Sequence, residues 1–224
     1  MSPEEATGLS EGWCAPLESK DFWGTALEPK SFLANLYKCK VGRELFLEIR
    51  LHGRGGQGVV TASEMLAEAA ILEGYHGQSI PYFGAERRGA PVVASARISD
   101  APVRKHSQVY RPDVISVFDT MFVLRKDVRE GLKEGGTVVV NHKKVPKISN
   151  FKVYSVNATK IALENGLIVA GWAVVNTAMV GATAKALGVI SKVALESVVR
   201  KRWRGDLAER NLRAALRAFE EVGG

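Results

Sequence analysis

Apolar and polar residues alternate between positions 45 and 51, and this period of two predicts a β-strand. A glycine-rich turn follows, and the apolar spacing after it predicts a helix over Val60–Glu73. Later apolar runs predict a helix over Met121–Leu132, which ends at Gly135-Gly136. They also predict strands at Tyr75–Ile80, Pro91–Ile98, Val114–Asp119, Thr137–Val140 and Phe151–Val156.

Beyond Asn157 the pattern becomes helical, with an apolar helix predicted over Gly166–Leu187. Two amphipathic helices are predicted over Lys192–Trp203 and Leu207–Val222, and Asp206 with Glu209 resembles a capping box that starts the second. Strands that alternate with helices indicate an α/β fold, a single layered domain over residues 45–224 with a largely parallel sheet flanked by helices.

Residues 1–44 show neither the helical nor the strand period, and we interpret them as an N-terminal extension. The segment contains scattered prolines and glycines together with Trp13 and Trp23. Two interpretations stand side by side: the aromatic residues dock on this domain or on a partner, or the segment is a partly disordered tail.

Composition narrows the functional class. The chain has 224 residues, of which 46% are hydrophobic and 25% charged, and this ordinary globular balance excludes global disorder. Its two cysteines, Cys14 and Cys39, cannot by themselves hold an iron–sulfur cluster or a typical zinc ion. The histidines lack metal-ligand spacing, and no nucleophile–base pair or carboxylate pair stands out. We therefore predict no catalytic residue and no metal ligand in this chain.

The net charge of +7 favours anionic partners without choosing among them. Nucleic acid is the weakest choice, because acids are interleaved throughout and the basic run over residues 200–204 is explained by its place at a helix end. The uncharged stretch over residues 165–184 is diluted by glycine, asparagine and threonine, which favours a buried helix over a membrane span. With no export signal and few cysteines, we expect a cytoplasmic protein.

The strongest local signal is a glycine loop between the first predicted strand and helix. Gly53, Gly55 and Gly58 satisfy the G-x-G-x-x-G pattern, and Gly56 and Gln57 lie within it. Glycines let an anion approach the backbone at a helix N-terminus, and the Arg54 guanidinium suits phosphate or carboxylate. The alternative is a tight turn whose glycines serve only helix–strand packing.

Dinucleotide binding by this loop lacks one expected residue. An acid is needed at the end of the second strand for the ribose hydroxyls, and Gln78-Ser79-Ile80 occupies that region. A stand-alone dinucleotide-binding oxidoreductase is therefore kept only as the alternative function.

A second loop runs from Tyr82 to Pro91, where glycines bracket Glu86, Arg87 and Arg88. Such a loop can present fixed charges at the strand ends, where open α/β sheets bind their ligands. A solvated loop with an internal pair between Glu86 and an arginine is equally compatible with this segment alone.

Taken together, the two loops resemble the gamma subunit of the 2-oxoacid:ferredoxin oxidoreductases. The resemblance runs from about residue 46 to about residue 187 and includes a third segment, Asn176-Thr177-Ala178-Met179-Val180-Gly181-Ala182. The form of the second loop is closer to the pyruvate and branched-chain oxoacid branch than to the 2-oxoglutarate branch. Residues 1–44 are not covered.

The resemblance implies an accessory subunit of a complex that oxidatively decarboxylates a 2-oxoacid, forms an acyl-CoA and reduces ferredoxin. Thiamine diphosphate, magnesium and iron–sulfur clusters are then expected on alpha, beta and delta subunits or their fused equivalents. Coenzyme A carries three phosphates, so its binding is expected at Gly53, Arg54, Gly55, Gly56, Gln57, Gly58, Glu86, Arg87 and Arg88. Contact with a partner subunit is the equally plausible role for these residues.

Overall fold

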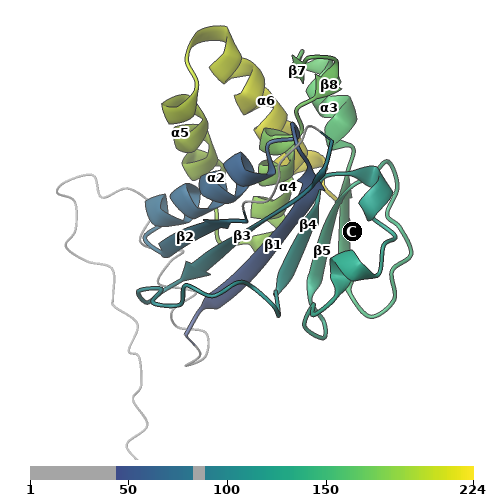
Figure 1. The fold of residues 1–224 in the computed structure, drawn as a ribbon. Helices are drawn as coiled ribbons and strands as arrows, with labels where there is room; N and C mark the ends of the chain where they lie inside the picture. The colour runs from purple at the N-terminus through teal and green to yellow at the C-terminus, as the bar shows by residue number, and fades with distance from the viewer. Residues whose placement is uncertain (1–43, 83–88) are drawn as a thin grey trace, which may run out of the picture.

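The computed structural model describes residues 44–82 and 89–224 and contains a six-stranded sheet with the order β2-β3-β1-β4-β5-β6 (Figure 1). The strands are β1 Phe46–Arg54, β2 His76–Pro81, β3 Pro91–Ser99, β4 Val114–Val117, β5 Thr137–Asn141 and β6 Lys152–Val156. Strands β1, β4, β5 and β6 run parallel, whereas β3 is antiparallel to both β1 and β2. The α/β fold with a largely parallel sheet is thus confirmed.

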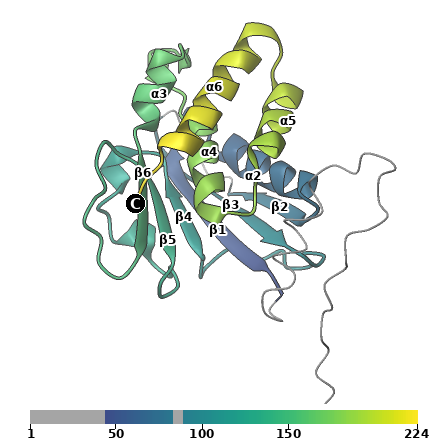
Figure 2. The same ribbon diagram turned by 180° about the vertical axis from the view of Figure 1, so that it is seen from behind.

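Helices cover one face of the sheet (Figures 1 and 2). They are α2 Val59–Leu72, α3 Ala158–Glu164, α4 Asn176–Leu187, α5 Lys192–Arg202 and α6 Gly205–Glu221. The main core lies between this layer and β1 residues such as Ile49 and Leu51. Helices α4 and α6 pack so closely that a Cβ added to Gly181 would lie 2.0 Å from the Ala215 carbonyl oxygen. Small residues in α4 therefore serve helix packing.

The opposite face carries a smaller core under the β4–β5 connection, built from Ile115, Val117, Val138 and Val140 with Phe122 and Val128. The predicted helix over Met121–Leu132 is wrong: this connection contains only the 3₁₀ turns η1 Thr120–Phe122 and η2 Asp127–Arg129. Met121 and Leu124 are exposed, so the apolar residues that made the segment look helical do not share one buried face.

The predicted helix over Gly166–Leu187 is only half right. A short hairpin of β7 Ile168–Val169 and β8 Trp172–Ala173 precedes α4. Its turn residues Ala170 and Gly171 have φ angles of 47° and 81°, which a right-handed helix does not allow. Uncharged composition alone did not separate this hairpin from the helix that follows it.

The C-terminal helices form where predicted, and the i, i+4, i+7 face of α6 packs on the core through Leu212, Leu216 and Phe219. The capping box was wrong. Helix α6 begins at Gly205 with Arg204 at the N-cap and no side-chain cap bond. Asp206 instead lies in the first turn and pairs with Arg210 at 2.6 Å.

No helix within residues 44–82 and 89–224 is long and apolar enough to cross a bilayer. Helix α4, which has Lys185 in its last turn as its one charged residue, is instead buried beneath α6 over most of its length. Apart from Glu44, the predicted N-terminal extension lies outside the described residues.

Candidate functional site

The glycine loop connects β1 to α2 at the edge where the parallel strands end. The chain leaving β1 enters the helical layer, whereas the chain leaving its neighbour β4 enters the 3₁₀ turns on the opposite face. The boundary between β1 and β4 is therefore a topological switch point, the position where open α/β sheets form a ligand crevice.

Hydrogen bonds close the glycine loop on itself. The Arg54 amide donates to Gln57 Oε1 at 2.8 Å, and the Gln57 amide donates to the Arg54 carbonyl at 3.0 Å. Gly58 has a φ of 75°, and α2 starts directly after it with no side-chain cap. A Cβ at Gly53 would lie 2.6 Å from Val59 Cγ2. Gly53 is thus required by close packing, and Gly58 by its left-handed backbone.

Arg54 ties three segments together. Its Nε donates to Asp119 Oδ2 at 2.8 Å, and its Nη1 donates to the Gly89 carbonyl at 3.1 Å. Its guanidinium carbon lies 4.7 Å from the centre of the Phe122 ring. The Arg54 side chain is 29% exposed, and two of its N–H groups are already bonded within the chain. This arrangement favours a positioning role for Arg54.

The end of the second loop lies against the first. The Gly55 amide donates to the Ala90 carbonyl at 2.9 Å, and the Gly89 amide donates to the Gly55 carbonyl at 3.1 Å. The predicted charged residues Glu86, Arg87 and Arg88 lie outside the described residues. The two motifs that resemble the gamma subunit therefore meet at one place. They are joined by backbone hydrogen bonds, which cannot be predicted from residue types.

Three further polar residues belong to this edge. The sequence predicted none of them as a site residue, although Asn176 begins the third segment that resembles the gamma subunit. Asp119 follows β4 and accepts hydrogen bonds from Arg54 and from the Met121 amide. Asn141 ends β5 and donates from Nδ2 to the Phe118 carbonyl at 2.8 Å. Asn176 begins α4 so close to Gly58 that a Cβ there would lie 2.8 Å from Asn176 Cβ. A polar residue directly after an apolar strand was the available signal for Asp119 and Asn141.

The β1 face opposite the helices carries further charge beside the loop. Arg50 donates from Nε to His52 Nε2 at 2.9 Å and from Nη2 to the Glu130 carbonyl at 2.6 Å. Burial, helped by the positive charge of Arg50, lowers the pKa of His52 to about 4. His52 is therefore neutral near pH 7, and it acts as an acceptor that orients Arg50.

The described part of the chain contains no group of three His, Cys, Asp or Glu side chains that could hold a metal ion. Cys14 and Cys39 lie outside the described residues.

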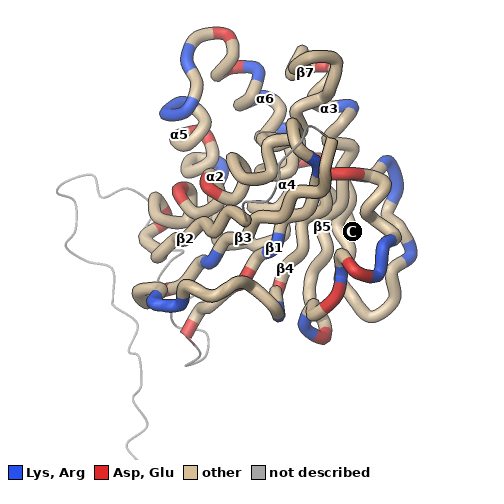
Figure 3. Tube along the Cα trace, in the orientation of Figure 1, with Lys and Arg blue, Asp and Glu red and all other residues tan. Residues whose placement is uncertain are grey.

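The basic run that ends α5 is neutralised by neighbouring acids. Arg202 donates to Glu64 and Glu68 at 2.7 Å each, and Arg200 pairs with Glu196 and Glu209. Basic and acidic positions alternate over much of the described chain (Figure 3). The end of α5, where Arg200 and Arg202 are paired with acids, is therefore not the unpaired basic stripe typical of a nucleic-acid-binding domain.

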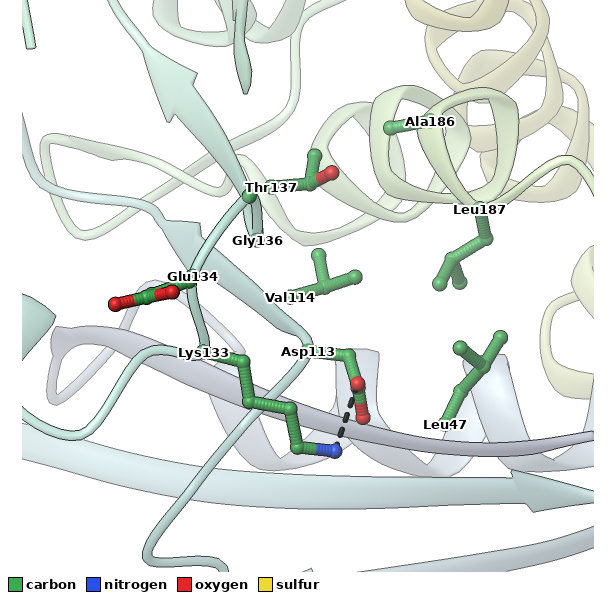
Figure 4. A pocket seen from close by; sticks show the side chains of 10 residues that line it. Leu47, Asp113, Val114, Lys133, Glu134, Gly136, Thr137, Ala186 and Leu187 are labelled. Carbon is green, nitrogen blue, oxygen red and sulfur yellow. Dashed lines mark hydrogen bonds and ion pairs between the residues drawn. The ribbon is translucent and has the colours of Figure 1, made fainter. Parts of the chain in front are cut away.

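A cavity of about 290 Å³ lies at the opposite edge of the sheet, where β4 and β5 begin (Figure 4). Leu47, Val114 and Leu187 line it together with Asp113 and Lys133, which form an ion pair at 2.7 Å. Because the cavity lies at the amino ends of the strands, it is not part of the glycine-loop site.

The dinucleotide alternative also fails on strand order. In a dinucleotide fold the second strand lies beside the first, but here the antiparallel β3 separates β2 from β1. Strand β2 ends in Ile80 and Pro81, and Tyr82 is the last described residue before the gap, so none of the described residues at this strand end is an acid.

Comparison with known proteins identifies the family. The family model for pyruvate ferredoxin/flavodoxin oxidoreductase matches residues 48–221. The Pyruvate/ketoisovalerate oxidoreductases common subunit gamma of Thermococcus litoralis is 46% identical over 183 residues, covering 79% of this chain and 97% of the relative. Pyruvate synthase subunit PorC of Methanothermobacter thermautotrophicus is also 46% identical, covering 79% of this chain and 96% of that protein.

Solved structures agree. The crystal structure of pyruvate oxidoreductase subunit PORC from Thermotoga maritima matches with a TM-score of 0.68 and 37% identity, covering 80% of this chain and 97% of that one. The 2-oxoglutarate:ferredoxin oxidoreductase of Magnetococcus marinus shares the fold at 21% identity and a TM-score of 0.63, and the match spans 80% of this chain but 30% of that larger chain. The chain therefore belongs to the pyruvate ferredoxin/flavodoxin oxidoreductase family, and the relatives it matches there are named as gamma or PorC subunits.

Proposed function

We propose that this chain is the accessory gamma subunit of a 2-oxoacid:ferredoxin oxidoreductase. The complex would decarboxylate pyruvate or a related 2-oxoacid, transfer the acyl group to coenzyme A and pass the electrons to ferredoxin. One observation carries this proposal: the match spans 97% of a relative named as a common gamma subunit, at 46% identity.

The proposed partners are the alpha, beta and delta subunits, or fused equivalents. Thiamine diphosphate, magnesium and iron–sulfur clusters would lie on these partners and carry the decarboxylation and electron transfer. The absence of a metal-binding cluster from residues 44–82 and 89–224 is compatible with this division of labour. We further propose that residues 1–44 help to dock the chain on a partner and that the complex is cytoplasmic. Deleting residues 1–44 should then weaken assembly.

We also propose that the glycine loop receives phosphate groups of coenzyme A. Support comes from its place at the switch point, from the start of α2 without a side-chain cap, and from the bonds that join it to Gly89 and Ala90. Because Arg54 is already bonded to Asp119 and Gly89, its main part would be to hold both loops for the phosphates.

The test is the Michaelis constant for coenzyme A of the assembled complex, measured anaerobically by viologen reduction with pyruvate. Arg54→Ala and Arg87→Ala should each raise this constant about 10-fold to 100-fold, as expected for the loss of a charged hydrogen bond worth about 1.5–3 kcal/mol. Arg111→Ala is the control, since Arg111 is exposed and lies outside both loops. Unchanged constants in both loop variants would refute coenzyme A binding and leave subunit contact as the role of the loops.

A further inference from the structure

The outer edge of β2 presents unpaired backbone groups. The Tyr82 amide donates inward to the Val93 carbonyl at 3.4 Å, and hydrogen-bonded pairs alternate along an antiparallel ladder. Tyr82, Ile80 and Gln78 therefore bond toward β3, whereas Gly77, Ser79 and Pro81 face away from it. No backbone group within residues 44–82 and 89–224 bonds to those three outward positions. The edge thus offers two amides and three carbonyls, because proline lacks an N–H.

The opposite edge strand of the sheet, β6, is partly covered by the C-terminal residues. On β6 the Ser155 amide donates to the Gly223 carbonyl at 2.7 Å, and the Gly223 amide donates back to Ser155 at 3.2 Å. Exposed edge strands are usually protected by charge, proline or a covering segment. Strand β2, with the sequence His-Gly-Gln-Ser-Ile-Pro, has no Lys, Arg, Asp or Glu and only a proline at its end. Its open edge is therefore suited to another strand.

On the helical face, Ile71 of α2 places apolar surface at this edge, and the cavity beside it extends around the edge to the β3–β4 connection. A cavity of about 620 Å³ beside Gly77 is lined by Ile71 of α2 and by Pro102 and Val103 of the β3–β4 connection. Ile71 is 54% exposed, so its apolar surface is available beside the open edge. An apolar side chain that entered this cavity would cover it.

The other face of the same edge is basic. Arg97, on the face of β3 opposite the helices, donates to the carbonyls of Lys105 and Ser107 at 2.7 and 2.6 Å and so holds the β3–β4 connection there. Exposed Arg104, Lys105 and His106 follow the cavity residues, and His106 Nδ1 lies 3.4 Å from Gln78 Nε2. Lys105 pairs with Glu48 at 3.2 Å, whereas Arg104 has no ion pair among the described residues. Carboxylates are the complementary groups for this face.

We propose that an extended segment of a partner subunit, with alternating apolar and acidic residues, adds to β2 as a further strand. Successive side chains of a strand point to opposite faces, so apolar residues would meet Ile71 while carboxylates meet Arg104 and His106. The proposal rests on the proposed function, because that function supplies the partner chain. The proposed interface is the β2 edge of the sheet, which lies on the opposite side of β1 from β4 and therefore away from the switch point.

Hydrogen–deuterium exchange tests the proposal on the complete chain, alone and in the anaerobically purified complex. The Gly77 and Ser79 amides should exchange at least tenfold more slowly in the complex than in the isolated chain. Carbodiimide cross-linking should join Lys105 to a carboxylate of the partner, in competition with its own Glu48, which lies 3.2 Å away. Equal exchange in an assembled complex would overturn the inference while leaving the proposed function intact. Failure of any chain to co-purify would instead overturn the function.

Variants separate strand addition from other contacts. Ser79→Pro removes an outward amide, whereas Ser79→Ala keeps it and loses only the hydroxyl bond to Ser63 Oγ. Ser79→Pro, with its thermal unfolding checked, should weaken assembly at least tenfold relative to Ser79→Ala. Arg104→Glu should weaken it too, and Lys147→Glu, exposed in the β5–β6 connection, should not. Two results would contradict the addition of a partner segment to β2. One is slow exchange of the Gly77 and Ser79 amides already in the isolated chain, and the other is a cross-link from Lys105 to residues 1–43 or to a second copy of this chain.

Discussion

Replacing Arg97 tests how the β3–β4 connection is held on the sheet. The Arg97 side chain is 0% exposed and donates from Nε to Glu48 Oε1 at 3.0 Å. Its other nitrogens donate to Gln78 Oε1 at 3.1 Å and to the carbonyls of Lys105 and Ser107. Arg97→Met removes the charge and every one of these donors while keeping an unbranched apolar stem.

The expected cost follows from burial. Breaking a buried ion pair by removing one partner costs about 3–5 kcal/mol, because the remaining charge and carbonyls lose their partners. Lys105 Nζ lies 3.2 Å from Glu48 Oε1 and keeps part of the compensation, so the lower half of this range is expected. For a chain of this length, about 3 kcal/mol corresponds to a fall in Tm of about 6–12 °C.

Urea unfolding of the isolated full chain, followed by circular dichroism, measures the loss. Glu48→Gln and the double variant Arg97→Met/Glu48→Gln complete a double-mutant cycle. Because the two side chains are in contact, the sum of the two single losses in unfolding free energy should exceed the loss in the double variant by about 1 kcal/mol or more. Arg111→Met is the exposed control and should stay within about 0.5 kcal/mol of the parent. An Arg97→Met chain within 1 kcal/mol of the parent, or strictly additive costs, would refute this account of the ion pair.

Two further predictions concern the glycine loop and its neighbour on β1. The pKa of His52 is about 4 in the native state against 6.5 when unfolded, so unfolding takes up a proton between these values and stability falls by up to about 3 kcal/mol as pH drops from 6.5 to 4. Urea unfolding across that pH range should show that His52→Gln removes this pH dependence of stability and that His142→Gln retains it. If stability fell equally with pH in both variants, the dependence would not come from His52. Gly53→Ala should cost about 1–3 kcal/mol, because the new Cβ would lie 2.6 Å from Val59 Cγ2, whereas Gly223→Ala, with open space around it, should be neutral. Equal unfolding midpoints for these two variants would show that the glycine loop is not tightly packed.

Local pattern was sufficient where one segment decides its own structure. The alternation of Leu47, Ile49 and Leu51 predicted β1, and the glycines after it predicted the turn into α2. Prediction from local pattern failed where packing against residues distant in the sequence determines the structure. The Met121–Leu132 segment carries enough apolar residues for a helix, but Phe122 and Val128 pack separately on the face of β4 and β5. The hairpin at Ala170-Gly171 was hidden because it carries no charge.

The candidate site shows the same division. Its glycines were visible because backbone conformation demands that residue type, as the φ of 75° at Gly58 illustrates. The pairing of Arg54 with Asp119 joins residues 65 positions apart, and only the sheet order brings them together. The antiparallel position of β3 had a readable signal, since a loop of residues 82–90 is too short for the crossover that parallel strands need.

The central claim is that this chain works as a subunit of a 2-oxoacid oxidoreductase. Anaerobic affinity purification of the tagged chain from its own host, followed by assay of the eluate, tests it most directly. Larger chains should co-purify and should reduce viologen in a reaction that requires both a 2-oxoacid and coenzyme A. A lone 24.3 kDa species without such activity would contradict the claim.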